Sequence, residues 1–519
     1  MVCKLLAVLC VIVQVCVSSR VLVMFPMAIR SHTILADSVV RTLVDAGHEV
    51  TYISTFTKEK ESDKLRLVNI SSINSQVTER GRFNLLELVR DPQPSNFIQK
   101  VGSNMARRAL QHPATQELLH NPHEHFDVVV AQWFYSGLLA PLSAVYDCPL
   151  IWYSTEDVFW MNLQLVHGQS NPAYSASMQT TAMASAPSTV WERANRIWQQ
   201  TYLSGWVYYM THYVETPKYR EIYESPLELR GRSLPDYESL VYNGSLLLVN
   251  SQPLLGQLLP VPPNVKYVGG HHVDVPTKPL PQNLQELLDQ SKNGVIFLSL
   301  GSDINSKEFP EGIKRGLVEV LGQLEQTVLW KIGEQLDNLP GNVHIVEGAQ
   351  QHSILNHTNT VMMITFGGFL SYIEAMFFGV PIVGIPFIGD QFLKMDIAAS
   401  RGRGIGVKFS EDLPWKLKEA IDGILENYSY RSNAKQASVI FQNHQVPPTQ
   451  EILYWVELVI STGGASHLRS PAVQLSTVER LHLDVVMVGL MILWFLSKVI
   501  KVWRAHWHGA DDDDDKKTQ

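Results

Sequence analysis

Short apolar segments alternate with helical periodicities along the first half of the chain. Residues 21–25 are continuously apolar, and residues 35–43 carry Leu, Val and Leu at intervals of four. The first pattern predicts a buried strand, and the second predicts an amphipathic helix. Further strands are expected over residues 50–53 and over residues 128–131, the latter ending at Gln132. This order predicts a βαβ unit.

The second half of the chain repeats this alternation. Helical stretches separate its apolar runs, which lie at residues 295–300, 327–330, 343–346, 361–364 and 382–385. Continuous apolar strands of this kind are covered on both faces of a parallel sheet. A proline-rich stretch over residues 260–281 separates the two halves. The predicted fold class is therefore α/β, with two doubly wound, Rossmann-like domains that face each other across a cleft.

Both ends of the chain carry apolar segments of another kind. A lysine, an apolar run and the small residues Ser18 and Ser19 follow one another as in a secretory signal peptide, so residues 1–19 are assigned to a signal. The alternative is a buried N-terminal helix. Residues 483–503 are apolar over the length of a transmembrane helix. The cationic residues beside and after this helix place residues 504–519 in the cytosol.

The net charge indicates the class of ligand, the cysteines bear on disulfide bonding, and the C-terminal tail indicates the cellular compartment. The 519-residue chain has a net charge of -8, which disfavours a nucleic-acid partner and favours a small-molecule ligand. Three of the four cysteines lie in the signal segment, which leaves Cys148 without an internal disulfide partner. The tail ends Lys516-Lys517-Thr518-Gln519, which looks like a dilysine retrieval signal; the alternative is a solvated charge cluster. We therefore expect a single-pass type I protein of the endoplasmic reticulum membrane with a luminal body.

Polar residues and a glycine pair follow several predicted strands. His32, Gln132, Ser302 and the pair Gly367 and Gly368 each lie just after one. Since open parallel sheets bind ligands beyond the carboxyl ends of their strands, these residues are candidates for one shared cleft. A glycine pair before a helix lets a diphosphate approach backbone amides at the helix N-terminus. A tight packing turn is the other explanation for such a pair.

A longer signature surrounds the glycine pair. It comprises residues 365–375, 379–381, 386–387 and 390–391, with residues 299–302 upstream and residues 454–455, 464–465 and 467–469 downstream. Together these segments resemble the signature of the UDP-glycosyltransferase family, most closely its invertebrate, membrane-anchored branch. The resemblance covers nearly the whole chain. It implies a GT-B-type fold and the inverting transfer of a hexose, with glucose as the leading candidate, from a UDP-sugar to a hydroxyl of a small lipophilic acceptor.

The resemblance also implies roles for individual residues. His32 matches the family's catalytic base, held by residue 132, and a neutral imidazole can take a proton from an acceptor hydroxyl. Glu374 lies three residues after Ser371 on the same helical face, where a carboxylate can accept hydrogen bonds from two vicinal ribose hydroxyls. The expected donor-binding residues are Ser302, Gln351, Phe366, Gly367, Gly368, Ser371, Glu374, Asp390 and Gln391.

The same resemblance divides the chain into functional parts. An N-terminal acceptor-binding domain over residues 20–275 and a linker over 276–290 precede a nucleotide-sugar-binding domain over 291–445. Helices over residues 446–482 are expected to pack back toward the N-terminal domain. The acceptor pocket is expected to draw on variable segments of the first half, residues 83–97 and 171–186.

No metal or cofactor is expected, and the UDP-sugar is a co-substrate. Outside the tail, the sequence has no Asp-x-Asp pair of the kind that holds a divalent cation for nucleotide-sugar chemistry. His120, His123, Glu124 and His125 have a ligand-like spacing, but their polar surroundings predict a solvated loop. The pattern of a phosphate-cradling P-loop, with its lysine after the glycines, is also missing.

Three positions depart from the family pattern. Gln132 stands where the family has an acid that stabilises the imidazolium, and Phe366 stands where a histidine contacts the diphosphate. Gly348 falls in a stretch that aligns with a Trp-x-Pro-Gln motif, so the aromatic platform for uracil is lost while Gln351 is retained. These losses keep an alternative function open: a catalytically impaired relative that binds a lipophilic ligand or partners an active transferase, as a homo- or hetero-oligomer.

Overall fold

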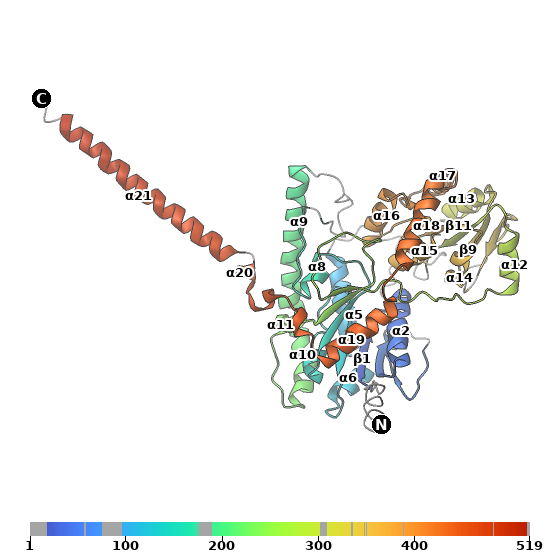
Figure 1. Cartoon of the computed structure of the whole chain (residues 1–519), viewed down its shortest axis with the longest axis horizontal. Coiled ribbons are helices and arrows are strands. Elements are labelled where there is room, and N and C mark those ends of the chain that lie inside the picture. The colour runs from blue at the N-terminus through green and yellow to red at the C-terminus, as the bar shows by residue number, and fades with distance from the viewer. Residues whose placement is uncertain are drawn as a thin grey trace, which may run out of the picture. The chain divides into compact units, whose positions relative to one another are not determined.

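The computed structural model describes residues 18–515 except 57–58, 75–95, 174, 176–188, 302–308, 334–335, 347, 349, 388 and 481. Most of the assigned signal, the dilysine tail, Ser302 and most of the expected acceptor segments lie outside the described residues. The chain forms two compact units, residues 1–468 and 469–519. Figure 1 labels the elements of both units.

A parallel sheet of seven strands occupies the first half of the chain, in the order β3-β2-β1-β4-β5-β6-β7. The strands are β1 (Arg20–Phe25), β2 (Glu49–Ser54), β3 (Leu65–Asn69), β4 (Val128–Trp133), β5 (Leu150–Ser154), β6 (Leu246–Val249) and β7 (Val265–Tyr267). The helices are α2 (Arg30–Asp45), α5 (Phe97–Leu110), α6 (Pro113–His120), α7 (Leu142–Tyr146), α8 (Trp160–Gln164), α9 (Val190–Tyr209), the π-helix η1 (Met210–Glu215), α10 (Thr216–Glu228) and α11 (Tyr237–Val241).

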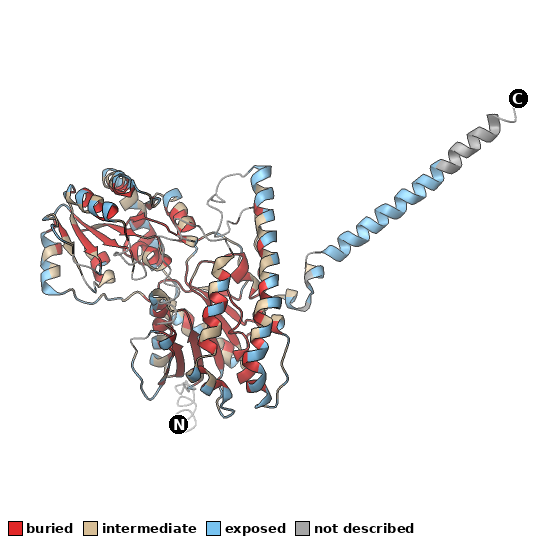
Figure 2. Cartoon of the chain, turned by 180° about the vertical axis from the view of Figure 1, so that it is seen from behind, coloured by how far each residue is buried: buried red, intermediate tan, exposed pale blue. Residues whose placement is uncertain are grey.

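The central strands β1 and β4 of this sheet are buried because both faces are covered (Figure 2). In β1, Leu22 and Met24 belong to one apolar core, whereas Val21 and Val23 belong to another. Successive side chains of a strand point to opposite faces, so a continuous apolar run feeds two cores at once. This explains why these strands lack the alternating pattern of a one-sided sheet.

A second parallel sheet, of six strands, follows in the order β10-β9-β8-β11-β12-β13. The strands are β8 (Val295–Ser299), β9 (Thr327–Lys331), β10 (Val343–Ile345), β11 (Thr360–Thr365), β12 (Ile382–Gly384) and β13 (Gly404–Gly406). The helices are α12 (Gln282–Gln290), α13 (Glu311–Gly322), α14 (Gln351–Asn356), α15 (Phe369–Phe378), α16 (Asp390–Ser400), α17 (Leu413–Glu426) and α18 (Tyr428–Gln442). The predicted strands are confirmed in both halves, with β4 continuing past Gln132 to Trp133.

Each sheet has one position where the strand order reverses direction. In the first sheet β1 has β2 on one side and β4 on the other, and in the second β8 lies between β9 and β11. Loops at the carboxyl ends of such strands diverge and leave a crevice for a ligand. The segments after β1, β4, β8 and β11 are those that carry the expected site residues.

The chain returns to the first half after α18. Helix α19 (Pro448–Ser461) lies beside α2, and its Ile452, Val456 and Val459 are fully buried in the core shared with β1. A short 3-10 turn, η3 (Ser466–Leu468), ends this unit.

The second unit contains the 3-10 turn η4 (Pro471–Gln474), α20 (Thr477–Arg480) and the long helix α21 (Leu483–Asp515). Residues 483–504 of α21 have a mean hydropathy of 2.1 and are long and apolar enough to cross a membrane. The exposed apolar side chains of this stretch need a nonpolar environment, which agrees with the transmembrane helix predicted over residues 483–503.

Candidate active site

The neighbouring positions of β1 and β4 bring His32 and Gln132 together. His32 lies in the first turn of α2, just after β1, and Gln132 lies near the end of β4. The Nε2 atom of Gln132 is 2.6 Å from the Nδ1 atom of His32. Phe134 packs edge-on against the imidazole, with 5.3 Å between ring centroids. The two residues expected at the catalytic position are therefore in direct contact.

The Gln132 amide determines which nitrogen of His32 carries the proton. If Nε2 of Gln132 donates to Nδ1, the imidazole proton is on its other nitrogen; if the amide is turned over, Oε1 accepts from Nδ1–H and the other nitrogen is free to act as a base. Burial lowers the pKa of His32 to about 3, so its ring is neutral at physiological pH. Gln132 is only 2% exposed, and its Oε1 has no hydrogen-bond partner among the described residues.

The glycine turn between β11 and α15 has a backbone conformation that favours glycine, but the ring of Phe366 packs against it. Gly367 has a φ of +81°, which favours glycine, and Gly368 caps the N-terminus of α15. A Cβ added at Gly368 would overlap the ring of Phe366, and one at Gly301, after β8, would lie 2.5 Å from its Cε1 atom. The phenyl ring therefore lies against both glycines, on the segments where a diphosphate would approach the backbone.

Three of the expected donor-binding residues meet on α14 and α15. Gln351 begins α14, and Ser371 and Glu374 lie on α15. The Nε2 atom of Gln351 donates a short hydrogen bond to Oε2 of Glu374 and lies 3.4 Å from Oγ of Ser371. Glu374 is 4% exposed, so its carboxylate depends on these neighbours.

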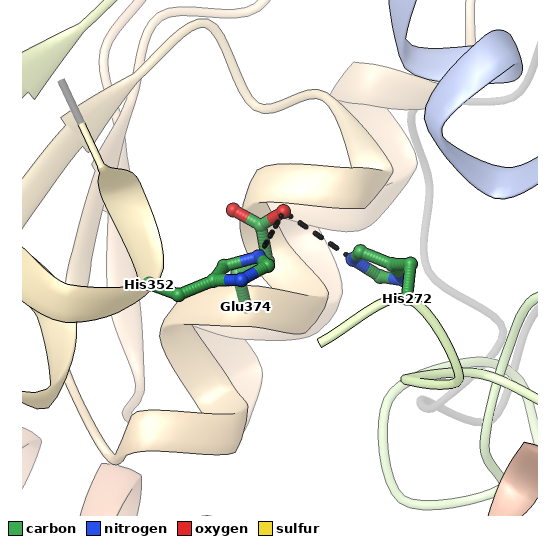
Figure 3. A group of neighbouring side chains, drawn as sticks. All are labelled: His272, His352 and Glu374. Atoms are coloured by element: carbon green, nitrogen blue, oxygen red, sulfur yellow. Dashed lines mark ion pairs between the residues drawn. The ribbon is translucent and has the colours of Figure 1, made fainter. Parts of the chain in front are cut away.

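Two histidines that were not expected complete this cluster (Figure 3). His272, in the turn after β7, places Nε2 at 3.3 Å from Oε1 of Glu374, and His352 of α14 places Nε2 at 3.1 Å from the same oxygen. Burial alone would raise the pKa of Glu374, but its close pairing with the two imidazoles holds it well below its ordinary value. Burial lowers the pKa of His272, whereas the carboxylates of Glu374 and Asp274 outweigh burial and raise the pKa of His352.

The expected sugar-binding pair begins α16. Asp390 lies 3.7 Å from Nζ of Lys394, and Oε1 of Gln391 accepts a hydrogen bond of 2.8 Å from the backbone of Phe387. Across from Asp390 lies Glu156, from the loop after β5, and both line a cavity of about 10 Å³, room for one water.

Glu156 is an acid that the sequence did not single out. Its Oε2 accepts a hydrogen bond of 3.0 Å from the hydroxyl of Tyr135. Burial and the nearby negative charge of Asp390 raise the pKa of Glu156 to about 8, and burial also raises the pKa of Asp390. The site therefore contains a carboxyl group that is largely protonated at neutral pH.

In the group with ligand-like spacing, His120, His123, Glu124 and His125, the carboxylate is paired with arginines. Glu124 lies 3.2 Å from Nη2 of Arg20 and forms a second, very short ion pair with Arg66. His125 contacts Arg20 at 2.9 Å. Arginine side chains thus pair with the carboxylate of Glu124, which is largely buried rather than solvated.

The architecture defines the class of protein. The fold is similar to that of the calicheamicin glycosyltransferase CalG4, with a TM-score of 0.55, 18% identity, and coverage of 85% of this chain and 99% of that one. It is also similar to a UDP-glucosyltransferase from Polygonum tinctorium, with a TM-score of 0.54, 14% identity, and coverage of 85% and 98%. Two doubly wound sheets with these relatives constitute a GT-B glycosyltransferase fold.

The family follows from the sequence of the whole chain. Residues 19–507 match the model of the UDP-glucoronosyl and UDP-glucosyl transferase family, and the chain belongs to this family. It is 26% identical to UDP-glucosyltransferase 2 of Dactylopius coccus over 96% of this chain and 95% of that protein. It is 27% identical to the 2-hydroxyacylsphingosine 1-beta-galactosyltransferase of Rattus norvegicus over 93% and 88%. The protein is therefore an enzyme of glycosyl transfer from UDP-sugars.

Proposed function

We propose that the enzyme transfers glucose from UDP-glucose to a hydroxyl group of a small lipophilic acceptor, with inversion at the anomeric carbon. The acceptor oxygen forms a bond to that carbon while the bond to the UDP oxygen breaks, and His32 takes the proton of the hydroxyl. UDP leaves with the bonding electron pair. No metal takes part in this step.

The contact between His32 and Gln132 is the observation that carries the proposal. A neutral, half-buried imidazole lies at the carboxyl end of the first sheet's central strands, the end at which open parallel sheets bind their ligands. Its low pKa makes it a weak base in the ground state, so the reaction needs an arrangement that strengthens it. Gln132 supplies orientation by a hydrogen bond but supplies no charge.

The donor would lie against the second sheet. Its diphosphate would approach Gly367 and Gly368 at the N-terminus of α15, where amide groups and the helix dipole favour negative charge. Its ribose would meet Glu374, and its sugar hydroxyls would meet Asp390 and Gln391. Ser302, Gln351 and Ser371 complete the proposed donor site.

We assign this activity to the lumen of the endoplasmic reticulum. A cleaved signal over residues 1–19, a span within α21 and a cytosolic dilysine tail would give a single-pass type I protein. A lipophilic acceptor suits this placement, because such molecules concentrate in the bilayer in which the enzyme would be anchored.

One specific observation favours a second function. The ring of Phe366 lies against Gly301 and Gly368 and cannot donate to an oxyanion. A diphosphate at this turn would have to displace the ring or accept an apolar neighbour. The second candidate is therefore a relative with a disabled donor site that binds a lipophilic ligand or partners an active transferase.

Calorimetric titration of the full-length protein in detergent with UDP and UDP-glucose separates the two functions. Binding by the unmodified protein supports the transferase, and an acceptor screen would then show turnover that His32→Ala abolishes. Absence of binding in the unmodified protein, together with binding by Phe366→His, would refute the transferase and support the second function. A matched Phe366→Leu variant, which cannot donate a hydrogen bond, controls for simple removal of the ring.

A further inference from the structure

Three side chains of types that bind metals in proteins converge on one point from separate segments of the first unit. His272 follows β7, His352 lies on α14 and Glu374 lies on α15. Figure 3 shows both imidazoles directed at the same carboxylate oxygen. One ligand atom from each residue lies within 4.8 Å of the other two. Tertiary packing alone makes this cluster, since 80 positions separate the two histidines in the sequence.

Two of the three distances between the candidate ligand atoms match those of a tetrahedral metal. With metal–nitrogen and metal–oxygen bonds of about 2.0 Å, two ligand atoms of tetrahedral zinc are about 3.3 Å apart. The two Nε2–Oε1 distances are 3.3 and 3.1 Å. A pair of imidazoles and one carboxylate is also a ligand set that zinc accepts, with the fourth position left open.

The surroundings of His272 independently support a metal ion at this position. Its side chain is 0% exposed, and neither ring nitrogen has a hydrogen-bond partner among the described residues. Its Nε2 approaches Glu374 without the alignment of a hydrogen bond. A metal between two ligands lies off the line that joins them, so this misalignment is what coordination requires. A buried imidazole without a partner is otherwise costly.

The surroundings hold the ring of His352 in place. On the side of the ring away from Glu374, Nδ1 of His352 accepts a hydrogen bond of 3.3 Å from the backbone N–H of Asp274 and lies 3.7 Å from Oδ2 of the same residue. These contacts orient the ring so that its Nε2 faces Glu374. The side chain of His352 is 16% exposed, which provides a route of entry from solvent.

We propose that His272, His352 and Glu374 form a binding site for a divalent transition metal of the zinc class. The site lies apart from the bond-making step, which remains metal-free. Its consequence for nucleotide binding rests on the proposed function: the oxygen of Glu374 that binds the metal is one of the two that a ribose would use. Metal and nucleotide would therefore exclude each other, and the metal would inhibit the transferase.

Titration of the metal-free, full-length protein with Co²⁺ tests the site without reference to activity. The protein is purified without a polyhistidine tag, and visible absorption reports tetrahedral coordination. We expect bands that saturate at one Co²⁺ per chain and disappear on addition of Zn²⁺. His352→Asn and Glu374→Gln should weaken binding by more than about tenfold. His123→Asn, which removes a histidine of the exposed loop, should leave it unchanged.

The result that overturns the proposal is either no saturable absorption or equal affinity in wild type and His352→Asn. If a variant does not fold, the Zn²⁺-induced rise in the melting temperature of the wild type decides, because a metal bound only by the folded state must stabilise it. Competition is measured by UDP titration at saturating Zn²⁺, where a weakening of about tenfold is expected, with the reciprocal effect on the metal. Metal binding without UDP binding would refute the proposed function and leave the metal site standing.

Discussion

Replacement of Gln132 by Glu tests how the catalytic position works. Glutamate has the length of glutamine, so a carboxylate oxygen would take the place of the amide nitrogen, which lies 2.6 Å from Nδ1 of His32. The oxygen can only accept, so Nδ1 must carry the proton and the other nitrogen becomes the base. The substitution thus adds a negative charge and selects the tautomer in one step.

The structure sets the size of the effect. An opposite charge within hydrogen-bond distance raises the pKa of a histidine by about 1–3 units, which would bring His32 from about 3 to about 4–6. Each unit is about 1.4 kcal/mol of imidazolium stabilisation, so the rate constant kcat should rise by about 10- to 1000-fold where His32 is protonated in the transition state. The charge also has a cost, because residue 132 is 2% exposed, and we expect a loss of about 1–3 kcal/mol in the free energy of unfolding.

Turnover of UDP-glucose against pH, measured on full-length protein with an acceptor found by screening, checks both expectations. In the wild type, kcat/KM should show no acid limb from His32 between pH 5 and 8; in Gln132→Glu the limb should appear at about pH 4–6. Gln132→Leu serves as the control, since it keeps the bulk and removes the hydrogen bond. If Gln132→Glu has the same pH profile and kcat as Gln132→Leu, the charge at residue 132 does not act through His32 and the reasoning fails.

Two further variants test the packing and the electrostatics of the donor side. Gly368→Ala should lower the free energy of unfolding by about 1–3 kcal/mol, because its Cβ meets the ring of Phe366, and Phe366→Ala in the same chain should restore most of it; additive losses in the double variant would contradict this contact. Glu156→Gln should raise the melting temperature at pH 8 but hardly at pH 5. The folded pKa of Glu156 is raised to about 8, so the wild type loses stability as pH rises above the unfolded value of about 4.3, by up to about 5 kcal/mol, since each pKa unit is about 1.4 kcal/mol. A difference in melting temperature that does not vary with pH would rule out this shift.

Local pattern was sufficient to predict the sheets. The apolar runs in residues 20–54 and 295–385 became strands, and those inside the sheets are buried, because a strand covered on both faces must be apolar at nearly every position; the edge strand β10 is only partly buried. The ends of elements were less well defined. Strand β4 includes Gln132 and extends to Trp133, since hydrogen bonds to β5 continue past the apolar run.

Some residues of the site could be predicted from a single segment of the sequence, whereas others are brought together only by tertiary packing. The glycine turn and the Ser371–Glu374 pair were predicted because they are local to one strand–helix junction. The partners of Glu374 were not, since His272 and His352 have no spacing rule that connects them. Glu156 was missed for the same reason: only the fold places this loop acid opposite Asp390.

The turn after β7 shows how the two halves of the first unit share one site. His271 is held in the first half, with Nε2 at 2.6 Å from the hydroxyl of Tyr153 and Nδ1 at 2.9 Å from Oγ of Ser38. The next residue, His272, faces Glu374 in the second half. Because His271 is fixed by these bonds, His272 can reach Glu374 only while α15 stays against the turn. A ribose or a metal that bound Glu374, as proposed, would therefore act on a contact that joins the two halves of the first unit.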